Sequence, residues 1–296
     1  MNWVLDVDIR AFYDTIDHEW LMKFLGHRIA DKRMLRLIKK WLKAGVIEDG
    51  IRSETTEGTP QGASASPLLA NVYLHYVFDR WARQWRKHKS HGDMIIVRFA
   101  DDTAIGFEHE RDARQFADDL RVRFADFALE LADEKTRLTE FGRHAAGRRK
   151  VRGLDQPETF DFLGFTHICG KTRKGRFMLR RITSKKRMRA KLQSVKDELK
   201  QRRHQSIPEQ GKYLGAVVRG HLNYYAVPGN TNAVASFRTQ ATRHWQRSLK
   251  RRSQRHCLNW ERMNRIATRW LPPAKCQHPF PDTRFDARTQ GRSPVR

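Results

Sequence analysis

The stretch Met94-Ile95-Ile96-Val97-Arg98-Phe99-Ala100-Asp101-Asp102-Thr103-Ala104-Ile105-Gly106-Phe107 decides the fold of the first part of this chain. Two short apolar runs, 94–97 and 104–107, flank a pair of adjacent aspartates, which predicts two strands of a hairpin. Adjacent aspartates repel each other and have poor strand propensity, so a turn that carries both is costly unless a cation neutralises them. Mg²⁺ prefers such carboxylate oxygens. The alternative is a solvated turn, in which Asp is common.

The composition indicates a nucleic-acid partner. The chain has 296 residues, enough for one large or two modest domains, and a formal net charge of +26 from 59 Lys and Arg against 33 Asp and Glu. Such an excess points to a polyanion, with a membrane surface as the alternative that no anchor motif supports. No apolar run reaches membrane-spanning length, and the N-terminus has no signal-peptide pattern. Three distant cysteines, Cys169, Cys257 and Cys276, favour a reducing compartment over disulfides.

The residues before the hairpin predict one strand and three helices. Residues 3–9 predict a short buried strand that begins almost at Met1, which leads us to expect a missing upstream part. Helical patterns cover 18–30 and 31–44, and Gly45 is a candidate C-cap. The third helix is expected to run to about Lys87, with Ser66 as N-cap and Pro67 at its first position.

The residues after the hairpin predict an α+β unit followed by an all-helical one. A helix is expected over 111–129, strands over 129–141, a loop over 144–158 and an apolar strand over 160–168 with a partner at 177–179. From 171 to 203 there are fifteen Lys or Arg against two acids. Helices are expected over 184–203, 209–224, 232–252 and 260–269. We therefore divide the chain into 1–180, 181–270 and an irregular tail, 271–296.

Four sequence blocks in a fixed order make residues 3–180 similar to the palm of a reverse transcriptase of the group II intron-encoded kind. They are Asp8-Ile9-Arg10-Ala11-Phe12-Tyr13-Asp14-Thr15-Ile16-Asp17-His18; Thr59-Pro60-Gln61-Gly62 with Ser66-Pro67-Leu68-Leu69-Ala70-Asn71; Phe99-Ala100-Asp101-Asp102; and Glu134-Lys135-Thr136 with Phe162-Leu163-Gly164-Phe165. The resemblance implies a right-hand polymerase palm with an antiparallel sheet, followed by a helical thumb, or maturase domain X. The segment Gly220-His221-Leu222-Asn223-Tyr224 resembles the core of that domain.

The resemblance also implies a catalytic site with two Mg²⁺ ions. Asp8, Asp101 and Asp102 would be the catalytic residues, and together with Ile9 they would hold the metals. Two metals can activate a primer hydroxyl and neutralise the leaving pyrophosphate. Asp6 is expected to lie behind Asp8, because both point the same way on a strand. Asp14 and Asp17 are expected to be structural or capping residues.

Several further residues take roles from the same resemblance. Tyr13 would stack under the nucleotide sugar, Gln61 and Gly62 would lie against the nucleotide and template, and Lys135 would approach the triphosphate or remain a solvated charge. A brace for the primer end is implied at Phe162, Leu163, Gly164 and Phe165, for which a buried strand is the alternative. Lys185, Lys186, Arg187 and Arg189 are candidate RNA-binding residues, since cations contact the RNA backbone. Tyr224 and Tyr225 are expected to serve packing.

The expected partners are intron RNA, an RNA template, a DNA primer and deoxynucleoside triphosphates, in a bacterial cytoplasm, associated with nucleoid or ribonucleoprotein. No membrane is expected, and a homodimer stays open. The chain departs from the family in three ways: Phe99 replaces a commoner Tyr, the upstream fingers blocks do not precede Met1, and no Cys-rich endonuclease module follows. Three functions stay open: an RNA-directed DNA polymerase, an RNA-binding maturase that assists splicing, and a non-catalytic RNA binder.

Overall fold

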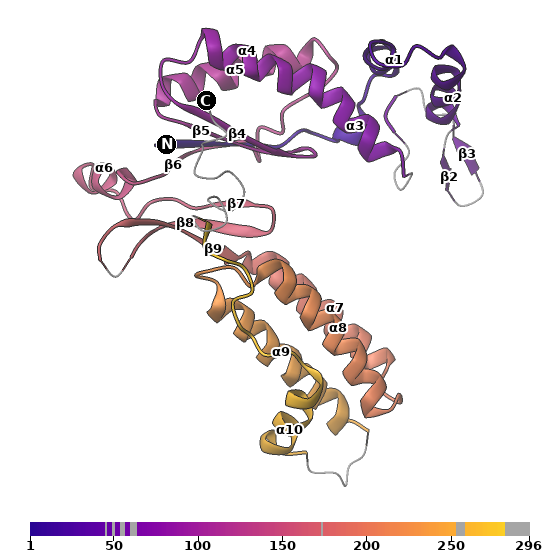
Figure 1. Cartoon of the computed structure of the whole chain (residues 1–296), viewed down its shortest axis with the longest axis vertical. Helices are drawn as coiled ribbons and strands as arrows, with labels where there is room; N and C mark the ends of the chain where they lie inside the picture. Colours follow the sequence, from indigo (N-terminus) through magenta and orange to yellow (C-terminus); the bar gives the residue numbers. More distant parts are fainter. Residues whose placement is uncertain are drawn as a thin grey trace. The chain divides into compact units, whose positions relative to one another are not determined.

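The computed structural model describes residues 1–44, 46–48, 51–53, 57–59, 64–172, 174–252 and 258–281. The chain divides into two compact units, Met1–Phe160 and Asp161–Arg296 (Figure 1). The sequence had placed this division at residue 180, but residues 161–180 group with the helices that follow them. Among the described residues, no helix is both long and apolar enough to cross a membrane. The candidate C-cap Gly45 lies outside these residues.

The first unit is built on one antiparallel sheet with the strand order β4-β5-β1-β6. Helices α3, α4 and α5 lie over one of its faces (Figure 1). Its elements are β1 (Trp3–Val7), η1 (Phe12–Asp14), α1 (His18–Gly26), α2 (Lys32–Lys43), β2 (Val46–Glu48), β3 (Ile51–Ser53), α3 (Ser66–Leu74), η2 (His75–Asp79), α4 (Arg80–His88), β4 (Met94–Phe99), β5 (Asp102–Phe107), α5 (Glu110–Ala125), β6 (Arg137–Glu140) and α6 (Ala145–Val151).

The core of this unit follows the predicted apolar patterns. Phe107 and Ile105 of the hairpin are fully buried, as are Phe116 and Leu120 of α5. Burying such side chains contributes roughly 1.5–3 kcal/mol each. Both strands of the predicted hairpin are confirmed, and so is the capping role of Asp17, whose carboxylate accepts a hydrogen bond from the Trp20 N–H at 2.8 Å.

The third predicted helix is not one regular helix. It begins at Ser66 after the N-cap Ala65, one residue away from the expected cap, and continues to His88 through a π-helical turn, η2. A π turn admits one extra residue per turn and frequently marks a functional site. Here it carries Asp79, whose partner is described below.

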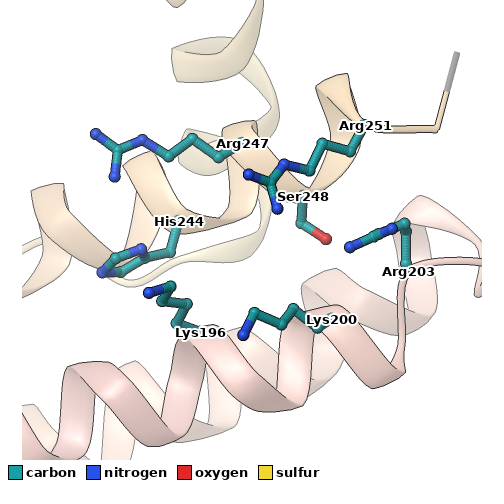
Figure 2. Close-up of a pocket in the computed structure, with 7 residues that line it drawn as sticks. All are labelled: Lys196, Lys200, Arg203, His244, Arg247, Ser248 and Arg251. Carbon is teal, nitrogen blue, oxygen red and sulfur yellow. The ribbon is translucent and has the colours of Figure 1, made fainter.

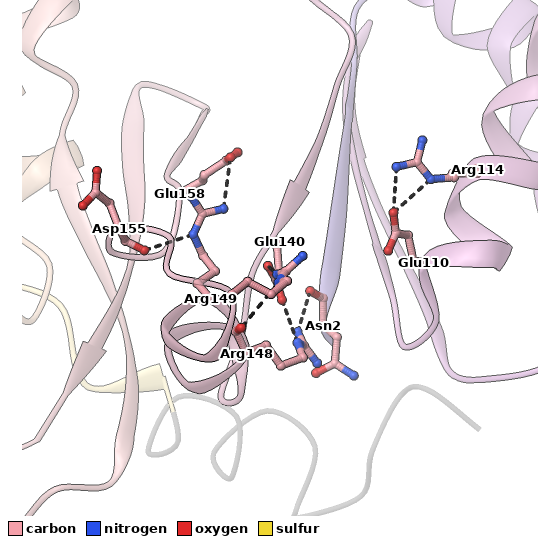
Figure 3. A network of polar contacts seen from close by, with 9 residues as sticks. Asn2, Glu110, Arg114, Glu140, Arg148, Arg149, Asp155 and Glu158 are labelled. Carbon is pink, nitrogen blue, oxygen red and sulfur yellow. Dashed lines mark hydrogen bonds and ion pairs between the residues drawn. The ribbon is translucent and has the colours of Figure 1, made fainter.

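The prediction of a loop over 144–158 is wrong, because residues 145–151 form helix α6. Arg148 Nε donates to Glu140 Oε1 at 2.7 Å, and Arg152 pairs with the other oxygen of the same buried carboxylate (Figure 3). Arg149 NH1 contacts Glu158 Oε1 at 3.2 Å. These partners lie outside the helix, so its polar sequence gave no sign of the packing that stabilises it.

The described residues of the second unit form a three-stranded sheet, in the order β7-β8-β9, and the helices α7 to α10. Its elements are β7 (Phe160–Phe162), β8 (Phe165–Lys171), β9 (Phe177–Thr183), α7 (Lys185–Gln201), α8 (Ile207–Tyr225), α9 (Thr231–Lys250) and α10 (Trp260–Trp270). The predicted helices are confirmed to within a few residues. The predicted strand over 160–168 is wrong as one strand, because a turn at Leu163 (φ 49°) and Gly164 (φ 78°) divides it.

The helices of this unit enclose a second core around Trp245 and Phe237, both fully buried. His221 lies inside it, with its ring stacked on Phe237 at a centroid distance of 3.7 Å. Burial, and then the charge of Lys191, lower the pKa of His221 to about 4. Residues 271–280 form no helix or strand, and the Gln277 N–H donates to the Ala226 carbonyl at 2.9 Å.

Candidate active site

The sheet register brings the three predicted catalytic aspartates to one end of two neighbouring strands. β1 and β5 pair antiparallel with Val7 opposite Thr103, so Asp8 and Asp102 occupy the next position of the same ladder. In the β4–β5 hairpin, Phe99 pairs with Asp102, which leaves Ala100 and Asp101 as the turn. Ala100 has a φ of 55°, a conformation that L residues rarely adopt. Such strain is typical of turns that aim a functional side chain.

The side chain of Asp8 has a cationic partner. Its Oδ2 lies 2.9 Å from Nζ of Lys135, which belongs to the turn just before β6. The hydrogen bond to Asp8 and its negative charge raise the pKa of Lys135. Among the residues that the structure describes, no three His, Cys, Asp or Glu side chains are gathered to hold a metal ion. The Asp8 carboxylate is paired with the ammonium group of Lys135.

The backbone of Ile9 continues this edge of the site. Ile9 forms a bridge with Leu131, made by hydrogen bonds from Arg10 N–H to Glu130 O and from Ala132 N–H to Asp8 O, both 2.9 Å. Neither bond uses the Ile9 carbonyl. Ile9, which the resemblance places among the metal-holding residues, thus has a carbonyl that this bridge leaves unused.

Tyr13 lies close enough to Asp101 to sense its charge. Burial, and then the negative charge of Asp101, raise the pKa of the Tyr13 hydroxyl. The backbone carbonyl of Tyr13 accepts a hydrogen bond from the Thr59 N–H at 2.7 Å. Gly58, at φ 80°, lies so near this segment that a Cβ there would be 2.8 Å from its backbone. Gly58 and Thr59 are thereby fixed to the Tyr13 turn, whereas Gln61 and Gly62 lie outside the described residues.

Sequence reasoning missed Arg98, which fixes the aspartate turn from behind. Its guanidinium donates to both oxygens of Asp79, at 2.8 and 2.7 Å, to Asn71 Oδ1 at 2.8 Å and to the Ala100 carbonyl at 2.7 Å. The Arg98 side chain is only 14% exposed, so the bidentate pair is well shielded from water. The sequence did offer a signal for Arg98, because it is the charged residue of the otherwise apolar strand 94–99. A strand seldom buries a charge that has no partner.

The predicted primer brace lies in the second unit and has the form of a turn. The Tyr224 hydroxyl donates to the Leu163 carbonyl at 2.8 Å, and the ring of Phe165 stacks on Tyr224 at 5.6 Å. Asp161 accepts a hydrogen bond from the Ser184 hydroxyl at 3.0 Å. Tyr224 is half exposed, and its ring and hydroxyl pack against this turn, in line with the packing role that the sequence favoured.

The predicted RNA-binding cations share the first two turns of helix α7. Lys185, Lys186, Arg187 and Arg189 are all exposed, and no acid lies in the first turn of that helix. These residues and the brace belong to the second unit, whereas Asp8, Asp101, Asp102, Ile9, Tyr13 and Lys135 belong to the first. The structure thus groups the predicted residues into two sets.

Residues 1–167 match the protein family described as reverse transcriptase (RNA-dependent DNA polymerase). A group II intron-encoded protein, LtrA of Lactococcus lactis, is 47% identical over 74 residues, which are 25% of this chain and 12% of that protein. Protein YkfC of Escherichia coli is 40% identical over 111 residues, 33% of this chain and 29% of that protein. These matches therefore span less than a third of each relative's length. A solved telomerase of Candida albicans covers 89% of this chain and 45% of its own, at 12% identity and a TM-score of 0.43.

Proposed function

The chain belongs to the reverse transcriptase (RNA-dependent DNA polymerase) family, and from this premise we propose that its first unit is the palm of a group II intron-type RNA-directed DNA polymerase. One observation carries the proposal. The register that pairs Val7 with Thr103 puts Asp8 next to Asp102, at the strand end where the turn holds Asp101. Carboxylates gathered at one strand end can hold the two metal ions that assist nucleotidyl transfer.

The residues at this strand end suit divalent cations. Asp8, Asp101, Asp102 and the Ile9 carbonyl would hold two Mg²⁺ ions, and all four offer the hard oxygen ligands that Mg²⁺ prefers. The ion pair of Asp8 with Lys135 supports this fit, because it shows that the position accepts a positive charge. Bound there, the ions would lower the pKa of a primer 3′-hydroxyl and neutralise charge on the triphosphate.

The neighbouring side chains of the first unit would bind and orient the nucleotide. Tyr13, held beside Asp101, would pack against the sugar and exclude a 2′-hydroxyl. Lys135 would leave Asp8 and bind a triphosphate oxygen. Its positive charge would then face a negatively charged group before and after the nucleotide binds. Gln61 and Gly62 would lie against the nucleotide and the template. Catalysis of this kind depends mostly on positioning and charge neutralisation.

The second unit would be the thumb, or maturase domain, and would bind RNA. Its turn at Phe162, Leu163, Gly164 and Phe165 would brace the primer end, supported by the hydrogen bond from Tyr224. Lys185, Lys186, Arg187 and Arg189 would contact the phosphates of intron RNA or template. Intron RNA, an RNA template, a DNA primer and deoxynucleoside triphosphates are thus the proposed partners, and the proposed assembly is monomeric or homodimeric.

Primer extension on an RNA template with Mg²⁺ tests the polymerase proposal. Asp101→Asn should lower the rate at least about a hundredfold, the scale of losing one electrostatic contributor, and should leave RNA affinity unchanged. Asp93→Asn, at the exposed opposite end of the same hairpin, is the matched control and should retain the wild-type rate. Equal extension by the Asp101 variant and the wild type would refute the assignment.

The second candidate function is splicing assistance without polymerisation, which the cation-rich helix α7 favours. If the chain is such a maturase, the wild type and the Asp101→Asn variant should accelerate splicing of the intron RNA equally well. Splicing that survives Asp101→Asn, together with no extension by the wild type, would select this candidate.

A further inference from the structure

A second cationic site lies between helices α7 and α9, within the second unit. It is a pocket of about 320 Å³ lined by Lys196, Lys200, Arg203, His244, Arg247, Ser248 and Arg251 (Figure 2). Lys196, Lys200 and Arg203 come from α7 or the turn after it, and the other four come from α9 or its C-cap. Figure 2 shows Lys196 rising toward His244, and Arg203 extending toward Ser248.

Helix spacing places these side chains on facing stripes. Lys196 and Lys200 are four residues apart on α7, and His244, Arg247, Ser248 and Arg251 follow the i, i+3, i+4, i+7 pattern. The buried Ser248 hydroxyl donates to the Leu199 carbonyl at 2.8 Å, which fixes the two helices at the floor of the pocket. The cations therefore face one another across a fixed cleft.

The acids nearby compensate little of this charge. Helix α9 contains no Asp or Glu. On α7, Glu198 pairs with Arg202, and Asp197 Oδ1 lies 3.1 Å from Lys200 Nζ. Asp197 also interacts with the charge of Lys196, so this one carboxylate compensates part of the charge of two pocket lysines.

Two observations favour the binding of an anion in this pocket. The Arg203 Nε is buried and has no hydrogen-bond partner within the described part of the chain, a cost that a bound acceptor would remove. Burial, and then the charges of Arg247 and Lys196, lower the pKa of His244. Like charges held this close destabilise the unit unless an anion joins them.

We propose that this α7–α9 pocket binds one or two backbone phosphates of RNA. It is separate from the surface formed by Lys185, Lys186, Arg187 and Arg189. The inference rests on the proposed RNA binding and adds a specific site to it. Three arginines line the pocket, and guanidinium groups suit a phosphate, whose oxygens take paired N–H donors. A volume of about 320 Å³ is at the small end of ligand pockets, and fits a phosphate with its sugar better than a base pair.

The test compares two double variants of the full chain that lose equal charge. The pocket pair is Lys196→Gln with Arg247→Gln. The control pair is Lys212→Gln with Arg219→Gln, two exposed cations of α8. Binding of a single-stranded RNA oligonucleotide is measured by fluorescence anisotropy across a range of salt. Inorganic phosphate is titrated separately, and NMR follows the His244 ring, assigned with His244→Gln.

The pocket pair should weaken RNA binding about tenfold and reduce the salt slope by about 1.4, or 0.7 for each lost contact with a single strand. RNA should also raise the pKa of His244 in the wild type and in the control pair. Arg203→Gln, which removes the unpartnered group, should likewise weaken binding. No variant should unfold below the wild-type temperature in the absence of RNA, because the pocket changes remove like-charge repulsion.

Three outcomes would overturn the inference. If the pocket and control pairs lose equal affinity for RNA and RNA leaves the pKa of His244 unchanged, the pocket does not bind RNA. The proposed RNA binding would then involve another part of the chain. If inorganic phosphate shifts His244 but RNA does not, the pocket binds a free anion. If the wild type binds no RNA at any salt concentration, the proposed function fails and this inference fails with it.

Discussion

The ammonium of Lys135 lies 2.9 Å from Oδ2 of Asp8, at the end of the sheet where Asp102 begins the paired strand β5. The two residues come from the end of β1 and from the segment before β6, so neighbouring strands bring them together. The lysine charge and a metal ion would compete for the same carboxylate oxygen, and this competition can be measured.

Lys135→Gln should raise the affinity of the chain for Mn²⁺ severalfold, because the carboxylate loses its competing cation. It should also raise the KM for deoxynucleoside triphosphate if Lys135 binds the triphosphate. Electron paramagnetic resonance reports free Mn²⁺, and Lys87→Gln on an exposed turn of α4 is the control. Unchanged Mn²⁺ affinity in the Lys135 variant would mean that the ion pair does not obstruct the site.

Arg98→Met should lower the free energy of unfolding of the first unit by roughly 2 kcal/mol. This loss is smaller than the loss expected when a fully buried ion pair is broken, because both partners are partly exposed. It removes the guanidinium that joins Asp79, Asn71 and the Ala100 carbonyl. Urea unfolding measures the loss, and Arg83→Met, an exposed change on α4, should leave stability near wild type. Polymerase activity should fall further in Arg98→Met than stability explains, because the turn bearing Asp101 loses its anchor.

Gly164→Ala should destabilise the second unit more than Gly175→Ala. Both glycines have positive φ, 78° and 75°, so both variants incur backbone strain of about 1 kcal/mol. Only at Gly164 would the new Cβ lie 2.6 Å from the Tyr225 hydroxyl, whereas at Gly175 it meets nothing within 4 Å. The difference between the two unfolding free energies therefore isolates the clash, and equal losses would contradict the packing of this turn on Tyr225.

His221 should make stability fall with acidification. Its folded pKa of about 4 lies below the ordinary value of 6.5, so the folded state favours the neutral ring. The stabilisation is present above pH 6.5 and is lost as the pH falls through about 4. His221→Phe should flatten this part of the profile, measured by urea unfolding at several pH values. The exposed His204, changed to Gln, should keep the wild-type profile.

Charge reversal of Lys185, Lys186 and Arg187 to Glu should weaken RNA binding and reduce its dependence on salt. Each lost phosphate contact lowers the salt slope by about 0.7 for a single strand. Reversing Arg83, Lys87 and Arg111, three exposed cations of the first unit, is the matched control. Equal losses in both triple variants would indicate nonspecific attraction by the net charge alone.

The sequence by itself determined what depends on local pattern. The two apolar runs around Asp101 predicted both strands of the hairpin, and the apolar face of residues 111–129 predicted helix α5, because burial of an apolar stripe needs no knowledge of the partner. The helices α7 to α10 were also expected from the sequence. Four motif blocks also identified the family that the match over residues 1–167 supports. The antiparallel α+β class followed from the same patterns.

Only the tertiary structure decided which polar groups meet. Helix α6 depends on Glu140, which precedes it, and the turn at Gly164 depends on Tyr224 and Tyr225, about sixty residues later in sequence. The same holds for Arg98 with Asp79 and for Lys135 with Asp8. A polar side chain has the same sequence signature whether it is solvated or paired, because its partner is set by strand register and helix packing over long separations, which local periodicity does not encode.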